Sequence, residues 1–180
     1  MSTVRIQPYE VKPAAFLLYD ERWPRVASIL IEAIENRDPL LRAEHVGSTS
    51  VPECGGKGVI DLVVTYTNGD LDVAKAALAK LGFQPQHGRD PFPESRPMRE
   101  GCLTTLGSIF RVHVHVIERD CEEHRQLVAF RDALRSDPSL RRAYEADKQR
   151  ILASGVTDSL DYCYAKGEFI TSTLSVIAKS

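Results

Sequence analysis

The sequence predicts an α+β protein, in which a small mixed sheet follows one helix and precedes a helical region. Two observations lead to this prediction. Residues 40–46, 59–66 and 108–118 have the patterns of strands, whereas the chain after Cys121 has helical spacing. No linker, repeat or low-complexity segment separates the two parts. We therefore expect a single domain over residues 1–180, with a sheet-containing core at about 20–118 and a helical region at about 121–178.

The elements at the start of the core follow from the spacing of apolar residues. Residues 21–36 are expected to form a helix, because apolar side chains recur on one face. Residues 40–46, LLRAEHV, favour a short strand that leads into Gly47. Residues 59–66, VIDLVVTY, are apolar on both faces, which is typical of a strand at the centre of a sheet.

The second half of the core is less regular. A helix is expected to begin at Asp70, whose side chain suits a helix cap, and to end at Gly82. Residues 84–105 contain four prolines and two glycines and favour a long loop or an irregular hairpin. Within it, residues 89–100 carry three arginines and are either a substrate lid or a basic loop. Residues 108–118 then alternate cleanly, as a strand does.

The C-terminal third is expected to form three helices. The second is opened by Pro138, and the last extends from about residue 160 to 178 after the break SGVTDS. We interpret two polar residues of the last helix as solvent-facing and two tyrosines as packing residues: Lys166, Glu168, Tyr162 and Tyr164.

Composition narrows the functional classes. The net charge is −2, which gives no general attraction to nucleic acid or to a membrane surface. No apolar run approaches the roughly 20 residues of a membrane span. The first residues lack the apolar core of a secretion signal, and the four cysteines form no CxxC pair. We expect a cytoplasmic protein with reduced thiols, and the sequence does not indicate an oligomeric state.

The turn between the first two strands is rich in glycine and hydroxyl groups. Gly47 permits unusual backbone angles and close approach of a ligand. Three hydroxyl residues follow it, and a helical turn at Pro52 would help their N–H groups to cradle a phosphate: Ser48, Thr49 and Ser50. Lys57 would add positive charge nearby. The alternative is a capped turn in which these hydroxyls bond only the local backbone.

Asp61 is the unusual residue of the second strand. It lies between Ile60 and Leu62 in a segment that otherwise buries its side chains. A buried carboxylate needs a partner such as a metal, an arginine or a set of hydrogen-bond donors. Transfer of phosphoryl or nucleotidyl groups uses carboxylates on neighbouring strands to hold magnesium beside a phosphate. The alternative is a structural aspartate paired with a local N–H.

The segment GSTSVPECGGKGVID, residues 47–61, resembles the signature of the GrpB family. Further similarity lies in YDERWP, RVHVHVIE, FRDALRSDP, AYEADK and YAKGEFI, so the resemblance covers nearly the whole chain. That family looks like a branch of the nucleotidyltransferase superfamily, with a polymerase-β-like core. The resemblance thus implies a nucleotidyltransferase-like mixed sheet with flanking helices. Some relatives are fused to dephospho-coenzyme A kinase, which implies nucleotide or coenzyme A metabolism.

The superfamily pattern is an apolar residue, Gly-Ser, a spacer, and then Asp-apolar-Asp/Glu. Gly47 and Ser48 match its first part and Asp61 its second, with twelve residues between Ser48 and Asp61. The second acidic position holds Val63, which cannot bind a cation. Either another set of ligands supports catalysis, or the domain only binds. Val63→Asp is expected to restore affinity for a metal.

The alternating strand 108–118 places Arg111, His113 and His115 on one face. Imidazoles two residues apart can share a transition metal, and Arg111 can bind a phosphate. The resemblance places this strand where the superfamily has its third acidic residue. We therefore expect His113 and His115 to face Asp61 and to share a divalent metal, namely magnesium, manganese or zinc. The alternative is a half-exposed polar face of an antiparallel strand.

Three functional hypotheses follow. The first is a metal-dependent nucleotidyltransferase-type enzyme acting on a nucleotide, another phosphorylated small molecule or a coenzyme A-related substrate. In it, residues 47–50 hold the phosphates, Asp61 binds the metal, and Lys57 and Arg111 offset phosphate charge. The second is a non-catalytic module that binds a nucleotide or cofactor, which Val63 favours. The third is a scaffold that uses the C-terminal helices as a partner surface.

Overall fold

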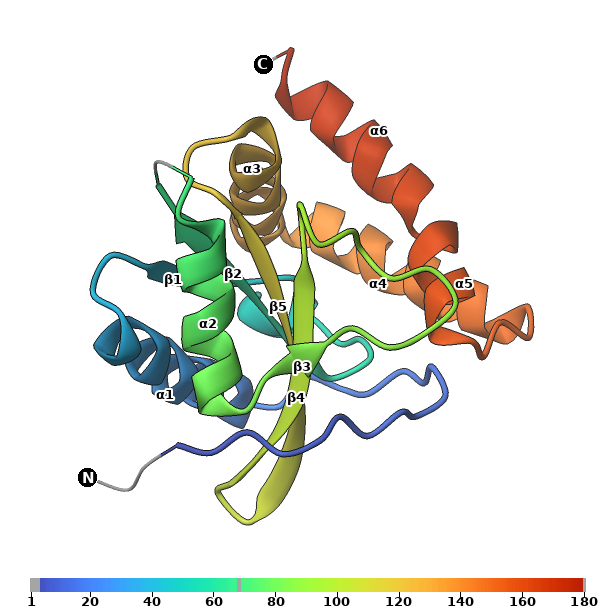
Figure 1. Cartoon of the computed structure of the whole chain (residues 1–180). Coiled ribbons are helices and arrows are strands. Elements are labelled where there is room, and N and C mark those ends of the chain that lie inside the picture. Colours follow the sequence, from blue (N-terminus) through green and yellow to red (C-terminus); the bar gives the residue numbers. More distant parts are fainter. Residues whose placement is uncertain (1–3, 68, 180) are drawn as a thin grey trace.

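The computed structural model describes residues 4–67 and 69–179. The elements are α1 (Arg22–Arg37), β1 (Arg42–Val46), η1 (Ser48–Ser50), β2 (Val59–Tyr66), α2 (Leu71–Leu81), β3 (Gln84–Pro85), β4 (Met98–Thr105), β5 (Ser108–Glu118), α3 (Glu122–Ser136), α4 (Pro138–Ala153), α5 (Ser159–Ala165) and α6 (Gly167–Ile177). Their arrangement (Figure 1) confirms an α+β fold with a C-terminal helical region.

The sheet is mixed, with the strand order β1-β2-β5-β4-β3. Strand β2 is antiparallel to β1 and parallel to β5, whereas β4 and β5 form an antiparallel pair. The predicted central position of residues 59–66 is therefore confirmed. Strand β2 has a neighbouring strand on each side and helices on both faces. Accordingly, six of its eight residues are apolar or aromatic, and a seventh, Thr65, is buried.

The two faces of the sheet have different partners. One face packs against α1 and α2 through the even-numbered apolar residues of β2 and β5, including Leu62 and Val114. The other face carries Val46, Val63 and Ile117, which pack against the start of α3. Figure 1 shows α4, α5 and α6 continuing from α3 beside this second face. Side chains alternate along a strand, so Asp61 and the polar residues of β5 point to the second face.

Several predicted elements need correction. Residues 98–105 form the regular strand β4, so the expected irregular segment is confined to residues 86–97. The last predicted helix is divided into α5 and α6 at Lys166 and Gly167. Asp70 precedes α2 as expected, but its side chain makes no capping hydrogen bond. The 3₁₀ turn lies at 48–50, ahead of Pro52.

An extended N-terminal segment, residues 4–18, joins the two parts of the molecule, and we refer to it as the strap. Gln7 exchanges two backbone hydrogen bonds with Cys102 of β4, and Leu17 exchanges two with Gly56. Between them, the Ala14 N–H donates to the carbonyl of Thr157, which precedes α5. The strap is thus fastened to the sheet, to the turn before β2 and to the helical region.

None of the helices within the described ranges is long and apolar enough to cross a membrane. The four cysteines are free thiols, as expected.

The close packing of the strap on α2 gives a test of the fold. Gly82 has φ +102°, and a Cβ there would lie 2.5 Å from the carbonyl oxygen of Ile6. Gly155 has φ +90° but open space around it. We expect Gly155→Ala to lower the free energy of unfolding by about 1 kcal/mol, and Gly82→Ala by at least about 2 kcal/mol, in urea titrations. Equal losses in the two variants would contradict this packing.

Candidate functional site

The turn after β1 rests directly on the Asp61 carboxylate. Gly47 has φ +69° and ψ −177°, a combination that only glycine adopts readily. A Cβ at this position would lie 2.5 Å from Asp61 Oδ2. Glycine is therefore required twice, for its backbone angles and for the space that the carboxylate occupies. The pairing of Val46 with Asp61 in the sheet brings the two residues together.

The three hydroxyl groups of this turn have different surroundings. The Ser50 hydroxyl donates to the carbonyl of Gly47 at 2.7 Å, and Thr49 Oγ1 lies 2.9 Å from His45 Nε2. Both residues are buried. The Ser48 hydroxyl forms no hydrogen bond with any residue that the structure describes, and the residue is partly exposed. Of the three predicted ligands, Ser48 is therefore the one whose hydroxyl is available.

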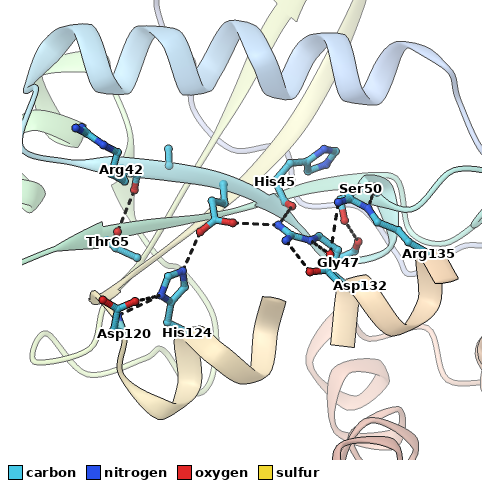
Figure 2. Close-up of polar contacts among 12 residues, drawn as sticks. Arg42, His45, Gly47, Ser50, Thr65, Asp120, His124, Asp132 and Arg135 are labelled. Carbon is cyan, nitrogen blue, oxygen red and sulfur yellow. Dashed lines mark hydrogen bonds and ion pairs between the residues drawn. The ribbon is translucent and has the colours of Figure 1, made fainter. Parts of the chain in front are cut away.

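Helices α3 and α4 hold the turn from the other side. Arg135 donates from Nε and Nη2 to the carbonyl of Ser50, at 3.1 and 2.8 Å (Figure 2). Further along, Glu145 accepts the Gly55 N–H at 2.6 Å, and Lys148 donates to the Gly55 carbonyl. The position of the turn is thus set jointly by the sheet and by two helices of the C-terminal region.

A second polar network joins α3 to β1. His124 Nε2 lies 2.9 Å from Glu44 Oε1, and Arg131 donates to Glu44 Oε2 at 3.2 Å; Figure 2 shows this network. Burial alone would raise the pKa of Glu44, but hydrogen bonds from His124 and Arg131 outweigh it and lower that pKa. The sequence assigned His124 no role, and here it fastens α3 to the sheet.

Asp61 and His113 are direct neighbours across β2 and β5. Asp61 Oδ1 lies 3.6 Å from His113 Nδ1. Burial would raise the pKa of Asp61, but the hydrogen bond to His113 and the charges of His113, His115 and Lys166 lower it to about 2. The Asp61 side chain is 27% exposed, so an ionised carboxylate reaches the surface beside the turn.

Both histidines already have partners. His113 Nε2 lies 3.0 Å from the Tyr9 hydroxyl of the strap. His115 Nδ1 lies 3.0 Å from Arg96 Nη1. Burial, followed by the charge of Arg96, lowers the pKa of His115 to about 4. The expectation that Arg111, His113 and His115 share the face of Asp61 agrees with the register of the sheet.

The predicted metal site is not preassembled. Within residues 4–67 and 69–179, no three His, Cys, Asp or Glu side chains are grouped so that they hold an ion. Joint coordination by Asp61, His113 and His115 thus stays a prediction that requires rearrangement. Val63 is fully buried in an apolar cluster under α3. Val63→Asp would therefore bury a charge in that cluster, on the face that also carries Asp61.

Three lysines surround the turn without a carboxylate partner. Lys148 of α4 is 1% exposed, and its ammonium group contacts Gly55, Cys54 and the ring of Tyr144. Lys57 donates to Ser159 Oγ at 2.7 Å and to Cys163 Sγ at 3.5 Å. Neither Lys148 nor Lys57 nor Lys166 forms an ion pair with a carboxylate in the described part of the chain. Burial lowers the pKa of Lys57 and of Lys148.

One of the lysines lies close to Ser48, and the other two share an aromatic ring. A Cβ at Gly56 would lie 2.7 Å from Ser48 Oγ and 3.3 Å from Lys148 Nζ. Lys57 and Lys166 lie on the Tyr162 ring, 5.2 and 5.6 Å from its centroid. Interaction with the Tyr144 phenol, and more weakly with Asp61, raises the pKa of Lys166. Lys166 is half-buried, so its interpretation as solvent-facing was wrong, whereas Glu168 is exposed as expected.

Other predicted residues are placed as follows. Arg111 Nη2 donates to the Lys57 carbonyl at 2.7 Å, which ties β5 to the turn. Tyr162 is buried as expected, and its hydroxyl has no hydrogen-bond partner among the described residues. Tyr164 is 60% exposed, so its interpretation as a packing residue was wrong.

The loop 86–97 extends from the sheet to α5 (Figure 1). Arg89 donates to Asp158 at 2.9 Å and to Asp161 at 2.8 Å, at the start of α5. At its other end, Arg96 pairs with Glu123 and contacts His115. The loop is thus fastened at both ends, and Arg89 and Arg96 are paired with carboxylates.

The comparisons with known proteins first concern the fold. The fold is that of nucleotidyltransferases. Cid1 in complex with its short product ApU has a TM-score of 0.52 at 14% identity, over 74% of this chain and 42% of Cid1. At this identity, the similarity concerns the fold alone. Cid1 is a poly(U) polymerase, as another of its crystal structures names it.

The chain belongs to the GrpB family, because the sequence model described as GrpB protein matches residues 13–175. A UPF0157 protein of Deinococcus radiodurans is 33% identical over 149 residues, which are 79% of this chain and 70% of the relative. Another from Streptomyces coelicolor is 32% identical, over 87% of this chain and 80% of the relative. The crystal structure of GrpB from Enterococcus faecalis has a TM-score of 0.66 at 20% identity, covering 91% and 99% of the two chains.

The low pKa of Asp61 gives a testable pH dependence. Its value of about 2 lies below the ordinary 3.8, so the ionised group stabilises the fold above pH 4. That contribution, about 2 kcal/mol, is lost as the pH falls from about 4 to about 2. We expect Asp61→Asn to flatten the fall in unfolding free energy over this interval in denaturant titrations. The control Asp72→Asn, at an exposed residue, should follow the wild type. An unchanged profile in Asp61→Asn would contradict the assignment.

Proposed function

We propose that this protein is a metal-dependent nucleotidyltransferase-type enzyme acting on a nucleotide or a coenzyme A-related substrate. The observation that carries the proposal is the group of unpaired lysines beside the turn. Lys148 lies beside Ser48, Lys57 and Lys166 share the Tyr162 ring, and none of the three has a carboxylate partner in the part of the chain described. The fold of nucleotidyltransferases supports the same class of reaction.

An ammonium group removed from water is costly unless an anion accompanies it. Three such groups around one turn favour a ligand with several negative charges close together, as in a polyphosphate. The Ser48 hydroxyl and the Lys148 ammonium group both approach Gly56, where they would lie 2.7 and 3.3 Å from a Cβ, so the two groups are near neighbours. A phosphate there would accept hydrogen bonds from both, and from the backbone N–H groups of the turn. Lys57 and Arg111 lie next along the site.

The donor set around Asp61 fits magnesium that arrives with its nucleotide. Magnesium is commonly held by one or two carboxylates together with substrate phosphates and water. Asp61 is ionised, partly exposed and in contact with the turn that would hold those phosphates. When bound, the ion would neutralise charge that develops on the transferred group. His113 presents Nδ1 toward Asp61 and keeps Nε2 against Tyr9, whereas Nδ1 of His115 is occupied by Arg96.

The second candidate is a non-catalytic module that binds the same ligand. It is favoured by Val63, which occupies the second acidic position and is fully buried. With a single carboxylate on β2, the site has fewer ligands for a cation than a two-metal mechanism uses. The two candidates share the lysine group and differ only in whether product forms.

Replacement of Lys148 tests the proposed ligand site. The wild type is unfolded thermally with nucleoside triphosphates and coenzyme A precursors in the presence of magnesium, manganese or zinc. A ligand at 100 times its dissociation constant adds about 2.7 kcal/mol, or roughly 5–10 °C for a chain of this size. We expect a bound nucleotide to give this shift with the wild type and with Lys80→Met, an exposed lysine. Lys148→Met should lose it, because its cation contacts the turn.

The ligand identified in this way is then tested for turnover with the wild type and Asp61→Asn. Product formed by the wild type and lost in a folded Asp61→Asn would support the enzyme. Binding without product for any acceptor would favour the binding module. A panel without any shift, or an equal shift in Lys148→Met, would contradict the proposed ligand site.

A further inference from the structure

We propose that Phe92, in the loop 86–97, is the platform on which the base of the bound nucleotide stacks. The inference rests on the proposed function and deepens it, because it assigns the aromatic part of the ligand to a segment that the phosphates do not use. Nucleoside triphosphates and coenzyme A both carry such a base, whereas a sugar phosphate does not. The platform therefore favours nucleotides among phosphorylated molecules.

The Phe92 ring is held in place with one face open. The side chain is 41% exposed, although it is large and apolar. The Arg96 guanidinium lies over the ring, 4.2 Å from its centroid, and the His115 imidazole stands at 86° to it with 5.8 Å between centroids. Because Arg96 Nη1 and His115 Nδ1 are themselves 3.0 Å apart, both neighbours lie on the same side of the ring. Neither covers the opposite face, which a flat ligand can reach.

The backbone around Phe92 is restricted before any ligand binds. Pro91 precedes it and Pro93 follows it, and a proline limits both its own backbone and that of the residue before it. The Phe92 N–H donates to Gln86 Oε1 at 3.0 Å, across the base of the loop. A ring that is already ordered loses little conformational entropy on binding, so more of the stacking energy appears as affinity.

The charges of this segment suit a base better than a phosphate. The three arginines of residues 89–100 are each paired with carboxylates: Arg89 with Asp158 and Asp161, Arg96 with Glu123, and Arg99 with Glu94. The lysine group beside the turn, in contrast, has no carboxylate partner in the described chain. Phosphates are therefore expected at the lysines, and the uncharged end of the same ligand is expected at Phe92.

The order of groups along β5 matches the order of groups in a nucleotide. Arg111 is bonded to the turn before β2, which belongs to the phosphate end of the site. His113 is the neighbour of Asp61, where the cation is proposed. His115 carries the Phe92 ring. All three lie on one face of the strand, and each step of two residues is about 6–7 Å, a distance that a ribose can span.

The proposal is tested by calorimetric titration with magnesium, using the four common nucleoside triphosphates and inorganic tripolyphosphate. Stacking on an aromatic side chain typically accounts for about tenfold or more in affinity. We expect Phe92→Ala to weaken the nucleotide that binds best by about this factor and to leave tripolyphosphate unchanged. Ile109→Ala, at an apolar residue of similar exposure, 47%, should match the wild type with both ligands.

A second variant tests the platform without phosphates. The chain has a single tryptophan, Trp23, which is 3% exposed, so the indole of Phe92→Trp would report on its own surroundings. We expect saturable quenching of its fluorescence by at least one of adenosine, guanosine, cytidine and uridine. Ile109→Trp should show no saturable quenching.

The outcomes separate this proposal from the proposed function. Equal affinity of the nucleotide for the wild type and Phe92→Ala would overturn the platform and leave the phosphate site in place. A parallel loss of tripolyphosphate would also overturn it, because the ring would then support the fold and not the base. If neither ligand binds the wild type, the proposed function fails, and the nucleosides decide on the platform alone. Saturable quenching of Phe92→Trp would then support it, and no quenching would overturn it.

Discussion

The contact between the Gly47 backbone and the Asp61 carboxylate is the constraint on which the rest of the site depends. A side chain at Gly47 would meet Asp61 Oδ2 at 2.5 Å, so the turn follows the surface of the carboxylate. Arg135, Glu145 and Lys148 then hold the turn from the helical side. A ligand that enters here meets groups from the sheet, the turn and the helices, and so would bridge both parts of the chain.

The charges of the site are divided between these parts. The sheet contributes one partly exposed carboxylate, Asp61, whereas Lys148 and Lys166 come from the helical region and Lys57 from the loop before β2. The cations have no carboxylate to neutralise them within the described residues. A free protein tolerates such a group at a cost in stability, and a polyanion with its cation would offset that cost. In the proposed site, the helical region therefore supplies two of the three cations.

The sequence predicted most of the fold because periodicity and turn residues agree with it. Strand β2 and the alternation of β5 were predicted within a residue, and Gly82 ends α2 as expected. Strand β4 was missed because prolines before it suggested an irregular segment, although none lies within it. Of the site, Gly47, Ser48 and Asp61 follow from a local motif. Lys148 and Lys166 could not be found in this way, because they lie 50 or more residues from the motif in sequence. Tyr9 could not be found either, because the strap has no periodicity.

The most direct test of the central claim is a crystal structure with magnesium and a non-hydrolysable nucleoside triphosphate, or with the ligand that stabilises the protein best. The account predicts phosphate oxygens within hydrogen-bonding distance of Ser48 Oγ and Lys148 Nζ, and the ion in contact with Asp61. Phosphates bound elsewhere on the molecule, with the lysine group unchanged and unoccupied, would contradict it.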